Sequence, residues 1–194
     1  VKDMQPVPVS LDKDRYITLE DNVPQPMLYI SYPTVYMGHK DEAPLDLFAY
    51  ALGGGKNSLL YKNLVETGYA TNVAAYHSCS ELSCTFDIYT QPNPAKGMEL
   101  APLLAKINAS IKELADKGIA ASEVTRLRSI IESSAIFGMQ SVAGKAKELA
   151  LGETLMNDPN YLTKGLSVFD TITAEEGIAS YKKYLENKPK VIMS

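Results

Sequence analysis

Alternation of apolar and polar side chains predicts three extended regions in the first half of the chain. Residues 15–20 and 27–32 each alternate over the length of a single strand, and prolines separate or end them. Residues 69–91 alternate on both sides of a short polar turn. This longer region is therefore predicted to be a β-hairpin.

The hairpin has a register that its own pattern supports, with residue 79 directly opposite residue 84. One face then carries Val73, Ala75, His77, Cys79, Cys84, Phe86, Ile88 and Thr90. The other face carries Asn72, Tyr76, Ser78, Thr85, Asp87, Tyr89 and Gln91. A mostly apolar face and a polar face are what a sheet covered by helices on one side requires.

Apolar residues at helical spacing follow the second predicted strand. A helix is expected to begin near Asp41 and to end at Gly53, a common helix-terminating residue. Its inward stripe consists of Leu45, Phe48 and Leu52. A second helix is expected to begin at Asn57, acting as N-cap, and to end at Gly68.

The chain is predicted to be helical from residue 100 almost to its end. Apolar stripes predict a helix over 100–118, a long helix from 124 that breaks within 138–152, and a short helix after 159. Thr173 and Glu176 have the spacing of a capping box, which predicts one more helix. Residues 190–193 are predicted to form a last strand.

This order of elements predicts an α+β fold in two layers, with a mainly antiparallel sheet and helices packed on one of its faces. Residues 1–13 are rich in proline and charged side chains and are interpreted as a linker or lead-in. No change in composition divides the rest, so residues 14–194 are expected to form a single domain.

Composition narrows the range of partners. The chain has 194 residues, 45% hydrophobic content and a net charge of −4, without a local cluster of Lys and Arg. Nucleic acid and anionic membrane surfaces are therefore not expected as partners. No apolar run approaches the roughly 20 residues of a membrane span.

The two histidines do not have the spacing of a zinc-protease helix. Such a helix needs two His four residues apart with a carboxylate between them, but the residue four positions after His39 is Ala43. No metal site is therefore expected in this chain. His77 is interpreted as a core-facing residue with one hydrogen bond, and His39 as a solvated loop residue.

The two cysteines have three interpretations. Opposite positions in the hairpin would let Cys79 and Cys84 form a disulfide, and two small buried thiols are the alternative. A nucleophile paired with His77 is a third interpretation, but no further residue is evident to orient the imidazole.

The six residues Gly53-Gly54-Gly55-Lys56-Asn57-Ser58 are the most unusual local feature of the chain. They follow a helix rather than a strand and lack the spacing of a phosphate-binding loop, so nucleotide binding is not expected. The loop is interpreted either as a close turn between helices or as a contact surface for an extended peptide. The substrate-contact candidates are Gly53, Gly54, Gly55, Asn57 and Ser58.

Five segments in this order resemble the second domain of insulinase-like (pitrilysin) zinc metallopeptidases. They are residues 16–29, which resemble that domain's first hairpin, together with 46–52, the glycine-rich segment 52–62, 157–162 and 173–176. The resemblance covers residues 14–194. It implies a non-catalytic domain that closes a substrate chamber over an extended peptide and is inactive alone.

The same resemblance implies that zinc and the His-x-x-Glu-His motif belong to a catalytic insulinase-like domain, in the same or a partner chain. No cofactor is expected here. Many members of the family place an Arg and a Tyr near the glycine-rich segment to reach the substrate carbonyl. Those positions fall on Val65 and Thr71, so no catalytic residue is expected.

Two other functional classes compete with this interpretation. Insulinase-like domains also occur in assembly subunits that cleave nothing, so a scaffold or peptide-binding module is the alternative. A free-standing cysteine hydrolase would need a reactive thiolate at Cys79 or Cys84. The sequence leaves the compartment open.

Overall fold

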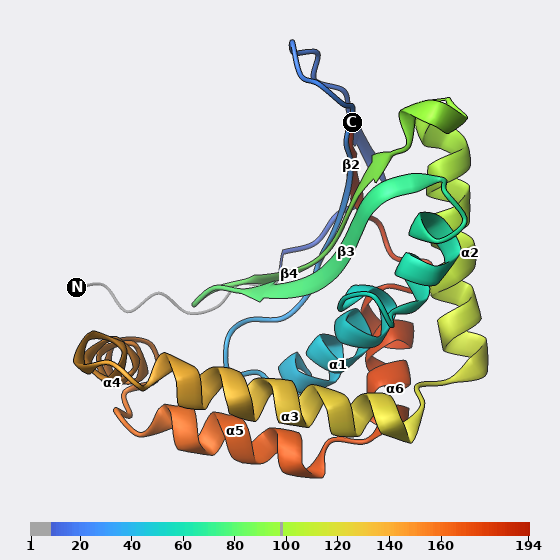
Figure 1. Cartoon of the computed structure of the whole chain (residues 1–194). Helices are drawn as coiled ribbons and strands as arrows, with labels where there is room; N and C mark the ends of the chain where they lie inside the picture. Colours follow the sequence, from blue (N-terminus) through green and yellow to red (C-terminus); the bar gives the residue numbers. More distant parts are fainter. Residues whose placement is uncertain (1–8, 98) are drawn as a thin grey trace.

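The structure is a computed structural model that describes residues 9–97 and 99–194 (Figure 1). Its strands are β1 (Arg15–Ile17), β2 (Leu28–Pro33), β3 (Ala70–Cys79), β4 (Cys84–Pro92) and β5 (Val191–Met193). They form one sheet in the order β1-β5-β2-β4-β3. The predicted α+β class is confirmed, with antiparallel pairing everywhere except between β1 and β5.

The hairpin of β3 and β4 has the predicted register. Cys79 pairs with Cys84 and Val73 with Thr90, and the pairing slips only between Ala70 and Asn72. Val73 and Thr90 are buried, as expected for the face that meets the helices. On the opposite face one residue departs from the pattern, because Asp87 is also buried.

The start of the chain differs from the sequence prediction in two ways. The predicted strand over 15–20 ends at Ile17, because its partner β5 ends at Met193. Residues 16–29 do not form a hairpin, since β5 lies between β1 and β2 and pairs with both. Within the predicted lead-in 1–13, residues 1–8 lie outside the described residues.

The helices gather on one face of the sheet (Figure 1). They are α1 (Glu42–Gly53), α2 (Leu100–Lys117), α3 (Ala121–Gly138), α4 (Val142–Met156), α5 (Tyr161–Thr171) and α6 (Ala174–Tyr184), with short turns η1 (Tyr61–Val65) and η2 (Pro94–Lys96). α1 contacts β3, and α6 packs beside α1. The predicted break within 138–152 is confirmed and falls just after Gly138, and the capping box of Thr173 with Glu176 is also confirmed.

The predicted second helix is present but shorter than expected: the chain is helical over 59–65, and most of this stretch is the π-helical η1. The amide of Glu66 donates to the carbonyl of Tyr61 at 3.1 Å, five residues back, as in a π-helix. The helix starts after Ser58, whose carbonyl accepts from Lys62 at 3.2 Å, rather than after Asn57. Asn63 fixes η1 against α2 through hydrogen bonds to Ser110 and Glu113.

The hydrophobic core lies between the sheet and α1, α2 and α6. Phe48 of α1 stands between Phe86 of β4 and Tyr181 of α6, with ring centroids 6.0 and 5.0 Å away. Farther from the sheet, α3 and α5 lie side by side, and large apolar side chains such as Ile136 and Phe137 are exposed. Burial is therefore concentrated in the layer that touches the sheet.

Candidate functional site

The glycine loop lies where the end of α1 meets β3. A Cβ atom on Gly53 would lie 2.2 Å from the backbone nitrogen of Ala75, so glycine is required there by close packing. Gly54 lies against Tyr50 of its own helix. Ser58 is buried and its hydroxyl donates to the carbonyl of Gly55 at 2.6 Å. These three candidates therefore have evident roles inside the fold.

The outer part of the loop reaches solvent. Gly55 has φ +101°, which only glycine adopts readily, and no atom lies within 4 Å of the position of a Cβ. Lys56 and Asn57 are also exposed. Contact between a peptide and this loop stays a prediction. Of the five candidate residues, Gly55 and Asn57 are the ones exposed to solvent.

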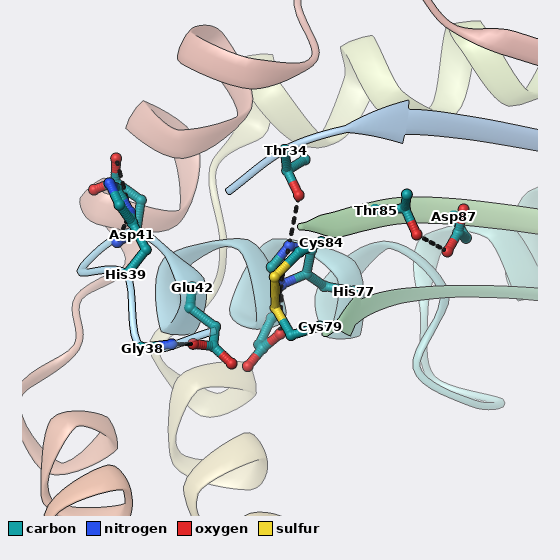
Figure 2. Close-up of a disulfide and its surroundings, with 11 residues drawn as sticks. Thr34, Gly38, His39, Asp41, Glu42, His77, Cys79, Cys84, Thr85 and Asp87 are labelled. Carbon is teal, nitrogen blue, oxygen red and sulfur yellow. Dashed lines mark hydrogen bonds and ion pairs between the residues drawn. A yellow bond between two sulfur atoms is a disulfide. The ribbon is translucent and has the colours of Figure 1, made fainter. Parts of the chain in front are cut away.

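A second cluster surrounds the turn of the hairpin, where Cys79 and Cys84 form a disulfide (Figure 2). The side chain of His77, on the same face of β3, is wholly buried. Its Nδ1 lies 2.9 Å from Oδ1 of Asp46 on α1, and its Nε2 lies 2.9 Å from the hydroxyl of Thr34. The imidazole therefore has two hydrogen bonds, one more than predicted from the sequence.

This cluster has ligand-type atoms but no free thiolate. His77, Cys79 and Cys84 bring ligand atoms within 4.8 Å of one another. Both sulfur atoms are joined in the disulfide, and both nitrogens of His77 are engaged. A thiolate nucleophile and a zinc–thiolate centre each need a free, deprotonated sulfur, so neither can form in this oxidised state.

A mainly apolar cavity of about 420 Å³ opens beside the start of α1. Apolar side chains of α3, α4 and α5 form most of its wall, namely Ile131, Leu151, Leu155, Leu166 and Phe169. Three carboxylates line it: Glu148 on α4, and Glu42 and Asp46 at the start of α1. Burial is the main cause that raises the pKa of Glu42 and of Asp46, and the charge of Asp46 raises that of Glu42 further.

The two carboxylates on α1, Glu42 and Asp46, already have protein partners. Glu42 accepts from the amide of Gly38 at 2.6 Å (Figure 2). Asp46 is hydrogen-bonded to His77. His39 lies in the same loop but is not solvated as predicted, because only 22% of its side chain is exposed and its Nδ1 accepts from the amide of Asp41. The polar side chains of Glu42, Asp46 and His39 at the cavity border are therefore held by hydrogen bonds within the protein.

The remaining candidate is the face of the sheet opposite the helices. Among the described residues, no helix covers this face (Figure 1). Its side chains from β2, β3 and β4 include Tyr29, Ser31, Tyr76, Thr85, Asp87 and Tyr89. We call this set the open sheet face. Its three aromatic rings make it a surface suited to contact with a peptide.

Two tyrosines meet across this face. The hydroxyls of Tyr29 on β2 and Tyr76 on β3 lie 3.2 Å apart, although β4 runs between their strands. Tyr76 is the more exposed of the two. The pattern of a single strand could not reveal this bridge, because it depends on the order of three strands.

The two positions at which many insulinase-like proteins have an Arg and a Tyr are occupied here by Val65 and Thr71. Val65 is partly buried and packs against the hydrophobic core. Thr71 is exposed, and its hydroxyl donates to the carbonyl of Gln91 at 3.5 Å. Neither supplies a cationic or phenolic donor to a substrate carbonyl.

Comparison of the sequence with protein families gives one decisive match. The profile described as the peptidase M16 inactive domain matches residues 1–131, more than half of the chain. The chain belongs to this family. A peptidase M16 inactive domain is not by itself a catalytic domain, which agrees with the missing His-x-x-Glu-His motif. No curated protein sequence matches the chain significantly.

Solved structures share the fold of this M16 domain. A protease from Helicobacter pylori is similar with a TM-score of 0.81 and 21% identity, over 94% of this chain and 44% of the other. A peptidase M16 inactive domain from Pseudomonas fluorescens has a TM-score of 0.78 and 20% identity, over 100% and 45%. Complex III2 from Candida albicans contains a chain with a TM-score of 0.73 and 12% identity, over 94% and 45%.

At sequence identities of 12–21%, the similarity to these three structures shows a shared fold and does not show a shared function. The chain spans less than half the length of each of these three proteins. Within the described residues, no helix combines the length and the apolar character that crossing a membrane requires.

Proposed function

We propose that this M16 domain is the non-catalytic part of a larger zinc metalloendopeptidase. It closes the substrate chamber and contacts an extended peptide, and it hydrolyses nothing alone. Zinc and the general base belong to a catalytic insulinase-like domain of the same or a partner chain. Membership of the inactive-domain family supports this division of labour.

The observation that carries the proposal is the open sheet face. An antiparallel sheet with helices on one side leaves its other face free, and such a face is normally polar and solvated. Here it presents Tyr29, Tyr76 and Tyr89, which offer apolar ring surface together with hydroxyl groups. Side chains of this kind are enriched where proteins contact peptides and other proteins.

The experiment measures peptide hydrolysis by the separated and the combined parts. The purified chain, its catalytic partner domain and an equimolar mixture are each incubated with an internally quenched peptide. We expect no hydrolysis by the chain, weak hydrolysis by the catalytic domain and a clear increase for the mixture. Replacing Tyr76 with Ser should reduce that increase, whereas Thr125→Ser, on the surface of α3, should not.

Two results would overturn the proposal. The first is zinc-dependent hydrolysis by the chain alone. The second is a stable complex with the catalytic domain that leaves its rate constant and its KM for the peptide unchanged.

A second candidate function is an assembly module without any role in proteolysis. The likeness to a chain of Complex III2 favours it, because the same fold occurs there within a large assembly. The partner domain discriminates between the two candidates. A partner that lacks His-x-x-Glu-His and forms a stable complex with this chain would support assembly, and a partner that carries the motif would support the chamber-closing role.

A further inference from the structure

Asp87 is a buried carboxylate with one unused oxygen. Only 2% of the residue is exposed. Its Oδ2 accepts from the hydroxyl of Thr85 at 2.7 Å, whereas Oδ1 has no hydrogen-bond partner among the described residues. A buried acceptor without a partner destabilises the fold, so its presence in the middle of a regular strand calls for an explanation.

Burial of Asp87 comes from the strands on either side of it. Tyr76 is its direct partner on β3, and Ser31 is its partner on β2. The strands β2 and β3 are separated by two strand spacings, about 10 Å. Because the hydroxyls of Tyr29 and Tyr76 nevertheless lie 3.2 Å apart, both side chains must lean across β4, beside Asp87.

The electrostatics of Tyr29 agree with this arrangement. Its pKa lies far above the ordinary value, first because the side chain is partly buried and then because of its hydrogen bond to Tyr76 and the nearby negative charge of Asp87. The carboxylate is therefore close enough to influence the tyrosine. The open sheet face thus contains one carboxylate, that of Asp87, flanked by the phenol groups of Tyr29 and Tyr76.

We propose that Asp87, Tyr29 and Tyr76 form a subsite for the side chain of a lysine in the bound peptide. This inference rests on the proposed contact between the open sheet face and a peptide. A buried carboxylate attracts a cation, and the faces of phenol rings also attract ammonium groups. The neutral hydroxyls supply further acceptors for the three N–H groups of lysine.

The free acceptor favours lysine over arginine. Guanidinium groups bind carboxylates best through two parallel hydrogen bonds, one to each oxygen. Oδ2 of Asp87 is already engaged by Thr85, so one oxygen remains. A single oxygen matches the point charge of an ammonium group.

Movement of the Tyr76 side chain would give a lysine access to Asp87. Tyr76 is 40% exposed, and β3 is the last strand of the sheet, so no further strand restricts its ring. Rotation of an exposed side chain is fast, on the picosecond to nanosecond scale, and breaks no backbone pairing. Turning this ring outward would uncover Oδ1 of Asp87.

The test compares three fluorescent peptides of extended sequence that differ at one position, which holds lysine, arginine or the neutral isostere norleucine. Binding to the whole chain in its disulfide form is measured by anisotropy. We expect the lysine peptide to bind about tenfold more tightly than the norleucine peptide, with arginine between them. The preference should weaken as salt is raised.

Asp87→Asn should abolish the preference for lysine and leave the affinity for the norleucine peptide unchanged. Asp170→Asn removes the same charge from an exposed position on α5 and serves as the matched control. The comparison of peptides on the unmodified chain needs no variant, so it remains decisive if Asp87→Asn does not fold.

The possible failures are distinct. If all three peptides bind with equal affinity, the lysine subsite is wrong while peptide contact stands. If none of them binds, peptide contact by the isolated chain fails and the subsite fails with it. A lysine preference that persists in Asp87→Asn would also overturn the assignment.

Discussion

Nδ1 of His77 lies 2.9 Å from Oδ1 of Asp46, and this contact joins β3 to α1 across 31 residues of sequence. Because a carboxylate only accepts, Nδ1 of the imidazole donates this hydrogen bond, and Nε2 on the other side of the ring lies 2.9 Å from the hydroxyl of Thr34. The disulfide lies directly beside this ring, since Sγ of Cys79 is 3.8 Å from Nδ1. The contact therefore holds the hairpin tip against the helix layer.

Asp46→Ala should lower the free energy of unfolding by about 2–3 kcal/mol, because it leaves a donor of the wholly buried His77 without an acceptor. Asp46→Asn keeps an acceptor oxygen and should cost less, about 1 kcal/mol. Urea denaturation of both variants measures the difference. Equal losses for the two variants would mean that the hydrogen bond is not what Asp46 contributes.

Glu42→Gln should alter how stability depends on pH. Burial, and then the nearby charge of Asp46, raises the pKa of Glu42 above its ordinary value despite the amide of Gly38 that bonds to it. The folded state therefore binds the proton more tightly than the unfolded state. The stability that this proton contributes is fully present below the unfolded pKa and is lost as pH rises through the folded pKa.

The glutamine variant carries no charge at this position and should escape this loss. Its free energy of unfolding relative to the unmodified chain should therefore increase between pH 4 and pH 7, as measured by urea denaturation at each pH. Glu132→Gln, on the exposed side of α3, is the control for removal of a surface charge. A relative stability that falls over this range would contradict the sign.

Gly53→Ala should destabilise the domain by more than about 2 kcal/mol, because the new methyl group would overlap the backbone of Ala75. Gly138→Ala provides the comparison, since nothing lies within 4 Å of its Cβ position and its φ is not positive. That change should raise stability by roughly 0.5 kcal/mol. Thermal unfolding of both proteins would show opposite shifts in Tm.

Reduction of the disulfide should lower the free energy of unfolding by about 2 kcal/mol, the amount expected when a loop with a sequence separation of 5 is released. Chemical denaturation with and without a reducing agent measures this change. The Cys79→Ser, Cys84→Ser double variant should show the same loss and should not respond to the reductant. A larger loss in the reduced chain than in the variant would point to another effect of the reductant.

The local pattern of the sequence was sufficient for features that depend on neighbouring residues. Alternation fixed the register of β3 with β4, because a slip by one residue would have turned Phe86 and Ile88 towards solvent. The capping box at Thr173 and Glu176 needs only two side chains three residues apart. Both predictions are confirmed.

Features that depend on several elements at once could not be derived in this way. The burial of Asp87 needs the order of β2, β4 and β3, and the hydrogen bond between His77 and Asp46 needs the placement of α1 on the sheet. Long-range strand pairing is also the reason why residues 16–29 do not form a hairpin, because β5, from the end of the chain, lies between β1 and β2. Such long-range contacts leave no periodic signal.

The concentration of burial near the sheet has a kinetic consequence. α5 has no buried residue and α4 only Gly152, whereas most of α1 is buried. Local opening should therefore require much less free energy in these two outer helices than in the sheet. Their amide protons should exchange with deuterium first, and a protease in limited amount should cut within residues 139–171 while the hairpin, its disulfide and α1 stay intact.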